Sequence, residues 1–134
     1  MKKINNIEKI INVYSWWKPS DIVFIKSMFW EENKFIVIFY CQLRNQKFGW
    51  PNQQDNFFEV SVNFENVSSL KIDFDYNSNG LQQVSGFDII DVSNNGLEFI
   101  NYQIEDYEND TIHFYCENII ILDVSSPVKL KFMT

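Results

Sequence analysis

From Phe58 onward, residues 57–65 alternate strictly between apolar and polar side chains, a spacing that is typical of a half-buried strand. They read FFEVSVNFE, and every second side chain from Phe58 to Phe64 is apolar. Because successive side chains of a β-strand point to opposite faces, this spacing predicts a strand with one buried face. The inward residues are then Phe58, Val60, Val62 and Phe64, and the outward ones Glu59, Ser61, Asn63 and Glu65.

Strand-like segments continue along most of the chain and are separated by short turns. They lie at residues 21–29, 35–43, 69–75, 84–92, 97–104, 111–116, 119–124 and 128–132. Short connections favour antiparallel neighbours. The sequence therefore predicts a mainly β (α+β) fold, an antiparallel β-sandwich or rolled sheet of about eight or nine strands. The expected core contains Phe58, Val60, Val62, Phe64, Leu70, Ile72, Ile112 and Phe114.

One amphipathic helix is predicted before the strands, over about residues 6–17. Its apolar residues Ile7, Ile10, Ile11 and Tyr14 have the i, i+3, i+4, i+7 spacing of one helix face. Asn5 or Asn6 is the expected cap, and Pro19 is expected to end the helix. A chain of 134 residues fits one domain, 1–134, with a β-rich region at about 21–133.

Several classes of protein are excluded by composition. No apolar run approaches the roughly 20 residues of a membrane span. The basic N-terminus is interrupted by Asn5, Asn6 and Glu8 before a signal-peptide core forms, so we expect a cytoplasmic protein. In that reducing compartment Cys41 and Cys116, both in strand-like runs, are expected to be two buried thiols.

Charge is divided unevenly along the chain. Residues 1–71 carry nine Lys or Arg and seven Asp or Glu, whereas residues 72–128 carry eleven acids and no Lys or Arg. Such a segment projects a negative field that repels nucleic acid and attracts cationic partners. The alternative is a solvated surface whose charge serves solubility.

Residues 105–110, EDYEND, concentrate this charge three residues before His113, the single histidine. Strand parity places His113 on the outward face, beside a charged hairpin tip rather than in a catalytic pair. Residues 75–80, DYNSNG, imitate a calcium loop, but Gly86 stands where the bidentate glutamate is required, so a hairpin turn is expected there. We therefore expect no enzyme, metal or cofactor. The predicted partner-binding residues are Asp88, Asp91, Glu105, Asp106, Tyr107, Glu108 and Asp110.

The segments FFEVSVNFENVSSLKI, VSGFDIIDV and YQIEDYENDTIHFYCENIIILDV resemble β-rich bacterial immunity proteins of the immunity-protein-50 type. The resemblance covers roughly residues 15–125 and implies protection against a polymorphic toxin. The family also shows an aromatic-Pro-Ser stretch followed by His-Asp. Here WWKPSDI keeps Trp17, Pro19, Ser20 and Asp21 without the histidine, so no role is carried over to it.

Two functions are consistent with these observations. The first is an immunity protein, a monomer or dimer, that blocks a basic toxin domain through its acidic surface; a nuclease is the expected toxin. The second is a small β-rich ligand-binding domain or enzyme with a pocket near His113 and the tryptophans Trp16, Trp17, Trp30 and Trp50. The acidic half of the chain and the missing catalytic set favour the first.

Overall fold

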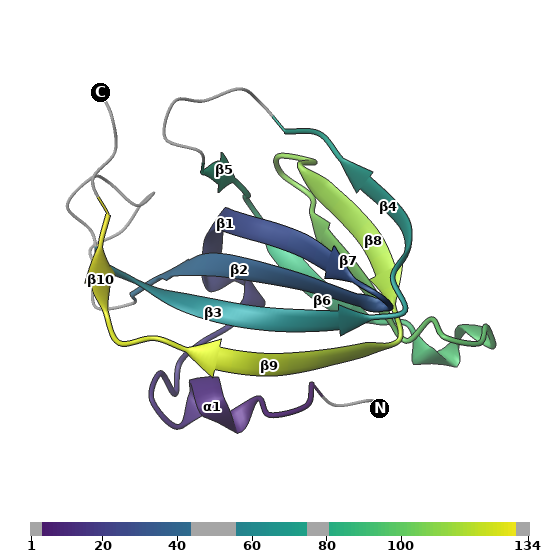
Figure 1. Cartoon of the computed structure of the whole chain (residues 1–134), viewed down its shortest axis with the longest axis horizontal. Coiled ribbons are helices and arrows are strands. Elements are labelled where there is room, and N and C mark those ends of the chain that lie inside the picture. Colours follow the sequence, from purple (N-terminus) through teal and green to yellow (C-terminus); the bar gives the residue numbers. More distant parts are fainter. Residues whose placement is uncertain (1–3, 44–55, 75–80, 131–134) are drawn as a thin grey trace.

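The computed structural model of the protein describes residues 4–43, 56–74 and 81–130 (Figure 1). Over these residues the chain is mainly β, with ten strands in two antiparallel sheets and a short helix near the N-terminus. The predicted fold class is confirmed. Two of the strands contain only two residues each. The predicted turn at residues 75–80, the possible calcium loop and Trp50 lie outside the described residues.

The two sheets differ in size and strand order. The large sheet has the order β10-β3-β2-β1-β5, and β9 also pairs with β3; the small sheet has the order β4-β8-β7-β6. The strands of the large sheet are β1 (Ile22–Glu31), β2 (Lys34–Gln42), β3 (Asn56–Glu65), β5 (Gln82–Gln83), β9 (Asn118–Val124) and β10 (Val128–Lys129). Those of the small sheet are β4 (Ser68–Ile72), β6 (Phe87–Asp91), β7 (Tyr102–Asp106) and β8 (Ile112–Cys116).

Aromatic side chains from both sheets meet in one core. The ring of Phe114 on β8 lies 4.9 Å from Phe64 and 5.7 Å from Phe35, centroid to centroid. Phe87 on β6 lies 5.2 Å from Phe39. These pairs have the edge-to-face geometry that aromatic rings prefer. The predicted core is confirmed for Phe58, Val60, Val62, Phe64, Ile112 and Phe114, all of them buried.

The prediction was wrong for Ile72, whose side chain is 41% exposed. Ile72 pairs with the buried Ile112, but β4 is the edge strand of the small sheet and has β8 as its one neighbour there. The pairing of β4 with β8 is also irregular between Ser68 and Lys71. The side chains of an edge strand have a neighbouring strand on one side only, so they stay partly accessible to solvent. Leu70, on the same strand, packs against the core but is only half-buried.

The predicted helix is much shorter than expected. α1 spans only Glu8–Ile11, and Pro19 begins a separate 3-10 helix, η1 (Pro19–Asp21), instead of ending a long helix. The apolar face was predicted correctly, because Ile10 and Tyr14 are buried and Ile7 and Ile11 pack against the core. Neither Asn5 nor Asn6 caps the helix by its side chain.

Contacts with β9 explain the short helix. The N–H of Asn5 donates to the carbonyl of Ile119 (2.8 Å), and Figure 1 shows α1 beside β9. The ring of Tyr14 stacks on Phe58 at 3.8 Å, and its hydroxyl donates to the carbonyl of Ser125 at 3.0 Å. Tertiary contacts on both sides of Glu8–Ile11 therefore hold the chain in positions that a continuous helix does not reach.

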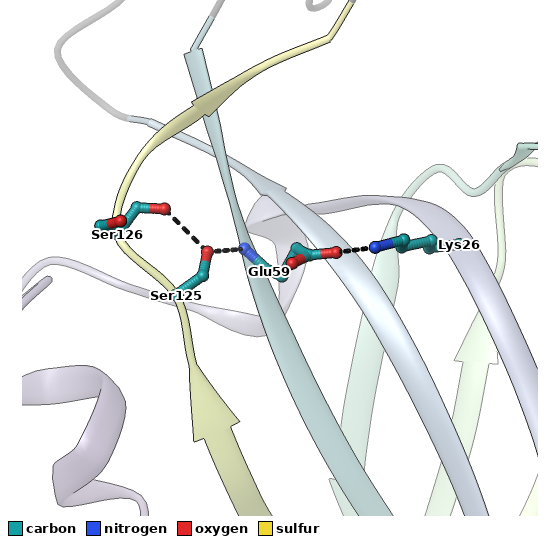
Figure 2. Close-up of polar contacts among 4 residues, drawn as sticks. All are labelled: Lys26, Glu59, Ser125 and Ser126. Atoms are coloured by element: carbon teal, nitrogen blue, oxygen red, sulfur yellow. Dashed lines mark hydrogen bonds and ion pairs between the residues drawn. The ribbon is translucent and has the colours of Figure 1, made fainter.

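A second, smaller apolar cluster covers part of the outer face of the large sheet. Val23, Tyr40 and Phe57 are its buried members. Beside it the ammonium group of Lys26 pairs with the Glu59 carboxylate (Figure 2). The same ammonium group lies 5.6 Å from the centre of the Tyr40 ring. The N–H of Glu59 donates to Ser125 Oγ at 2.8 Å. On this face of the large sheet, Lys26 and Glu59 therefore neutralise each other.

Both cysteines are free and buried, as predicted. Burial raises the pKa of the Cys116 thiol to about 12 and raises the pKa of Cys41 as well. Trp17 Nε1 donates to Cys41 Sγ at 3.5 Å. Neither thiol is therefore available as a thiolate near neutral pH. Among the described residues, no helix has the length and apolar character needed to cross a membrane.

Candidate functional site at the acidic hairpin

The acidic stretch EDYEND is the tip of the β7–β8 hairpin, as predicted. The N–H groups of Asn109 and Asp110 donate to the carbonyl of Asp106 at 3.2 and 2.7 Å, which closes the turn. Asp110 adopts a positive φ of 55°, a conformation that Asp tolerates better than most residues. The turn therefore projects residues 107–110 from the end of the small sheet.

Asp106 is buried beneath this turn, although the sequence places it among the partner-binding residues. Its side chain is 0% exposed, and Oδ1 accepts hydrogen bonds from the N–H groups of Thr111 and Ile112, both at 2.8 Å. Burial raises the pKa of Asp106, and the backbone hydrogen bonds oppose that rise only partly. Asp106 thus supports the turn from within and adds nothing to the accessible surface.

Hydrogen bonds tie the turn to the chain just before β6. The N–H of Glu108 donates to the carbonyl of Ser85 (3.1 Å), and Ser85 Oγ donates to Glu108 Oε2 (2.9 Å). Thr111 Oγ1 and Asn109 Nδ2 both donate to the carbonyl of Gln83, at 3.0 and 3.2 Å. The turn is therefore held in one position by a segment more than twenty residues away in sequence.

An open groove of about 670 Å³ lies beside the turn. It is lined by η1 with the residue before it, by the chain entering β6 with the start of that strand, and by the hairpin tip. One residue each from β1 and β2, Val23 and Gln42, completes the lining. Its volume falls within the roughly 300–1,000 Å³ of ligand pockets. The polar and aromatic residues at its surface include Lys18, Ser20, Asp88, Tyr107 and Glu108.

The remaining predicted acids lie at other places on the small sheet. Glu105 faces outward directly opposite Asp88 on β6, so two like charges stand side by side. Asp91 ends β6, where its Oδ1 accepts hydrogen bonds from Ser93. Asp110 lines a second hollow. The structure therefore brings together Asp88, Tyr107 and Glu108 at the groove and distributes the other four residues elsewhere.

The second hollow, of about 340 Å³, is lined by Lys71, Ile72, Asp73, Asp110 and His113. His113 is half-buried, and its Nδ1 atom is buried without a hydrogen-bond partner among the described residues. None of the tryptophans in the described part of the chain lines this hollow: Trp16 and Trp17 pack in the core and Trp30 stacks on Phe35. Within the described ranges no group of three or more His, Cys, Asp or Glu side chains is arranged to hold a metal ion.

Sequence reasoning missed the groove residues Lys18, Ser20 and Gly86. Gly86 interrupts the strand-like run VSGFDIIDV, and an isolated glycine in such a run often marks a close approach by another part of the chain. The role of Gly86 could therefore have been predicted from the sequence. The position of Lys18 and Ser20 beside the hairpin could not, because only the tertiary fold brings η1 to the hairpin.

No protein-family model matches this chain, and it matches neither a curated protein nor a solved structure. The resemblance to immunity proteins therefore stays a prediction from the sequence.

Proposed function

We propose that this protein is an immunity protein that binds and neutralises a cognate bacterial toxin domain, a nuclease with a basic substrate groove, in the cytoplasm. The observation that carries the proposal is the hairpin tip, where Tyr107 is 67% exposed on a turn fixed by hydrogen bonds. Rigid aromatic side chains are frequent anchors of protein interfaces. An exposed, preorganised tyrosine among carboxylates suits a basic protein partner.

The charge of the small sheet supports the same proposal. Residues 72–128 contain no Lys or Arg, so Asp88, Glu105, Glu108 and Asp110 have few cations near them in sequence. A surface of one sign accelerates encounter with a surface of the opposite sign and repels the phosphates of nucleic acid. The proposed activity is inhibition by binding and requires no catalysis, metal or cofactor from this chain.

The test replaces Asp88, Glu105, Glu108 and Asp110 together by their amides and measures binding to the cognate toxin domain at low and high salt. We expect the association rate at low salt to fall about tenfold or more, and its salt dependence to weaken, because electrostatic steering is lost. Protection of a bacterial host that produces the toxin should fall in parallel.

A matched control removes the same number of exposed acids elsewhere, from Glu8, Glu31, Glu32 and Asp123. This control should bind as the parent does. Equal affinity and equal salt dependence in the small-sheet variant and the parent would rule out the acidic surface as the interface.

A second candidate function is the binding of a small ligand in the hollow at His113. Two observations favour it: the His113 Nδ1 atom has no hydrogen-bond partner among the described residues, and Lys71, Asp73 and Asp110 bring charges of both signs to the hollow. A thermal-shift screen of polar metabolites against the parent and a His113→Gln variant tests it. A ligand that stabilises the parent alone would support this function. A screen in which no ligand stabilises the parent more than the His113→Gln variant would argue against it.

A further inference from the structure

The groove beside the hairpin has an aromatic side that the backbone holds in place. Gly86 has a φ of +69°, and a Cβ atom added there would come within 2.7 Å of Tyr107 Cε1. The Tyr107 ring therefore rests against a position that only glycine fits, while most of the side chain remains exposed. A ring supported on one face can offer its other face to a cation.

Two carboxylates line the same groove. Glu108 Oε2 accepts a hydrogen bond from Ser85 Oγ, and Asp88 Oδ1 accepts one from the N–H of Ile89 at 2.8 Å. Each carboxylate therefore has a fixed orientation and a second oxygen with no hydrogen bond to a described residue. Buried Phe87 and Val23 supply an apolar base suited to the aliphatic part of a long side chain.

One cation, Lys18, also lines the groove, from the position just before η1. The N–H of Lys18 donates to Asp21 Oδ2 at 2.8 Å, which holds η1 and the start of the groove in place. The ammonium group of Lys18 forms no ion pair with any acid in the described part of the chain. Its positive charge disfavours a cationic ligand and favours an anionic one. The change in ligand affinity when Lys18 is replaced therefore shows whether the ligand is cationic or anionic.

We infer that this groove receives a lysine or arginine side chain from a loop of a protein partner, with its charge beside Asp88 and Glu108 and its alkyl or guanidinium group against the Tyr107 ring. The inference rests on the proposed function and names the part of the toxin that binds. Glu108 and Asp88 supply the charge, Tyr107 supplies the contact, and Gly86 positions that ring.

The experiment titrates the ¹⁵N-labelled full chain with Nα-acetyl-arginine amide and Nα-acetyl-lysine amide and follows backbone amide shifts. The uncharged Nα-acetyl-norleucine amide and the anionic Nα-acetyl-glutamate amide are the matched probes. We expect shifts at Gly86, Phe87, Tyr107 and Glu108 with the two cationic probes alone. Tyr107→Ala should weaken their binding about two- to thirtyfold, the range of a cation–π contact.

The Lys18→Met variant tests whether the groove binds a cationic or an anionic ligand. It should bind the cationic probes about two- to fivefold more tightly at low salt, and this gain should shrink at high salt. Lys34→Met is the control, since Lys34 and the groove residue Gln42 stand at opposite ends of β2. Groove shifts with the glutamate probe, weaker cation binding in Lys18→Met, or no shift with cationic probes would each overturn the inference.

Measurements on the toxin separate this inference from the proposed function. If the four-amide variant loses toxin binding while Tyr107→Ala and Lys18→Met leave it unchanged, the toxin docks on the acidic surface without using the groove. In that case the inference fails and the proposed function stands. If the four-amide variant binds the toxin as the parent does, the acidic surface is not the interface, and the inference fails with it. If the parent itself neither binds nor inhibits the toxin, the proposed function fails.

Discussion

The large and small sheets share one aromatic core but treat their charges differently. On the large sheet, Lys26 pairs with Glu59, and Lys34 stands opposite Glu31 on β1 and Glu65 on β3. On the small sheet, Asp88 stands opposite Glu105, and Lys71 is the single Lys or Arg in its strands. Neutralised charge stabilises a fold locally, whereas unneutralised charge acts at a distance on a partner. The large sheet therefore pairs charges of opposite sign within the fold, whereas the small sheet places two acids side by side.

The largest effect should come from the core that both sheets share. Replacing Phe64 on β3 or Phe114 on β8 by alanine should each lower the free energy of unfolding by about 3–5 kcal/mol. Both rings are essentially fully buried and contact each other across the sheets. Denaturant unfolding measures the loss, and Phe99→Ala, at a side chain 57% exposed, is the control. A small loss at either core position would show that the sheets do not share one core.

The next effect concerns the buried charge of the small sheet. Asp106→Ala should cost about 1–3 kcal/mol because the N–H groups of Thr111 and Ile112 lose their acceptor. Burial raises the pKa of Asp106 above its ordinary 3.8. The associated stability is therefore present below that value and lost as pH rises through the raised pKa.

Asp106→Asn keeps an acceptor oxygen and cannot ionise, so it should lack this loss. Denaturant unfolding of the parent and Asp106→Asn at a series of pH values measures the difference. The variant should gain stability relative to the parent as pH rises from below 3.8 towards neutrality. A gap between the two proteins that stays constant with pH would contradict the assignment.

A smaller effect is expected at the glycine that supports Tyr107. Gly86→Ala should cost about 1–2 kcal/mol for its left-handed backbone, plus the displacement of the Tyr107 ring. Gly96 provides a matched control, since its φ is +80° and nothing lies within 4 Å of an added Cβ. Gly96→Ala should show the backbone cost alone. Equal losses in thermal unfolding would mean that Tyr107 moves away without cost.

The smallest effects test the charge difference itself, and they should have opposite signs. Lys26→Met removes a partly exposed ion pair from the large sheet and should destabilise the protein by about 0.2–1 kcal/mol. Glu105→Gln relieves its repulsion with Asp88 and should stabilise the protein by up to about 1 kcal/mol. Both changes should shrink in high salt. Destabilisation by both variants would remove the contrast between the sheets.

Strand parity by itself indicates that Asp106 is buried. Tyr102 and Ile104 are inward residues of β7, and Asp106 lies on the same face two positions later. Alternation therefore predicted its burial, but its place in a run of acids suggested an exposed residue. The hairpin itself was predicted correctly because its turn and its two alternating strands are local features.

Most of the strands, most of the core and the segregation of charge follow from the amino-acid sequence alone, because alternation and composition are properties of neighbouring residues. Tertiary contacts explain why the helix stops after Ile11, why Ile72 lies at an exposed edge, and why Lys18 and Tyr107 line the same groove. Each of these depends on contacts between segments far apart in the chain. The local periodicity of a sequence does not specify which distant segments come into contact, because those contacts depend on how the two sheets pack together.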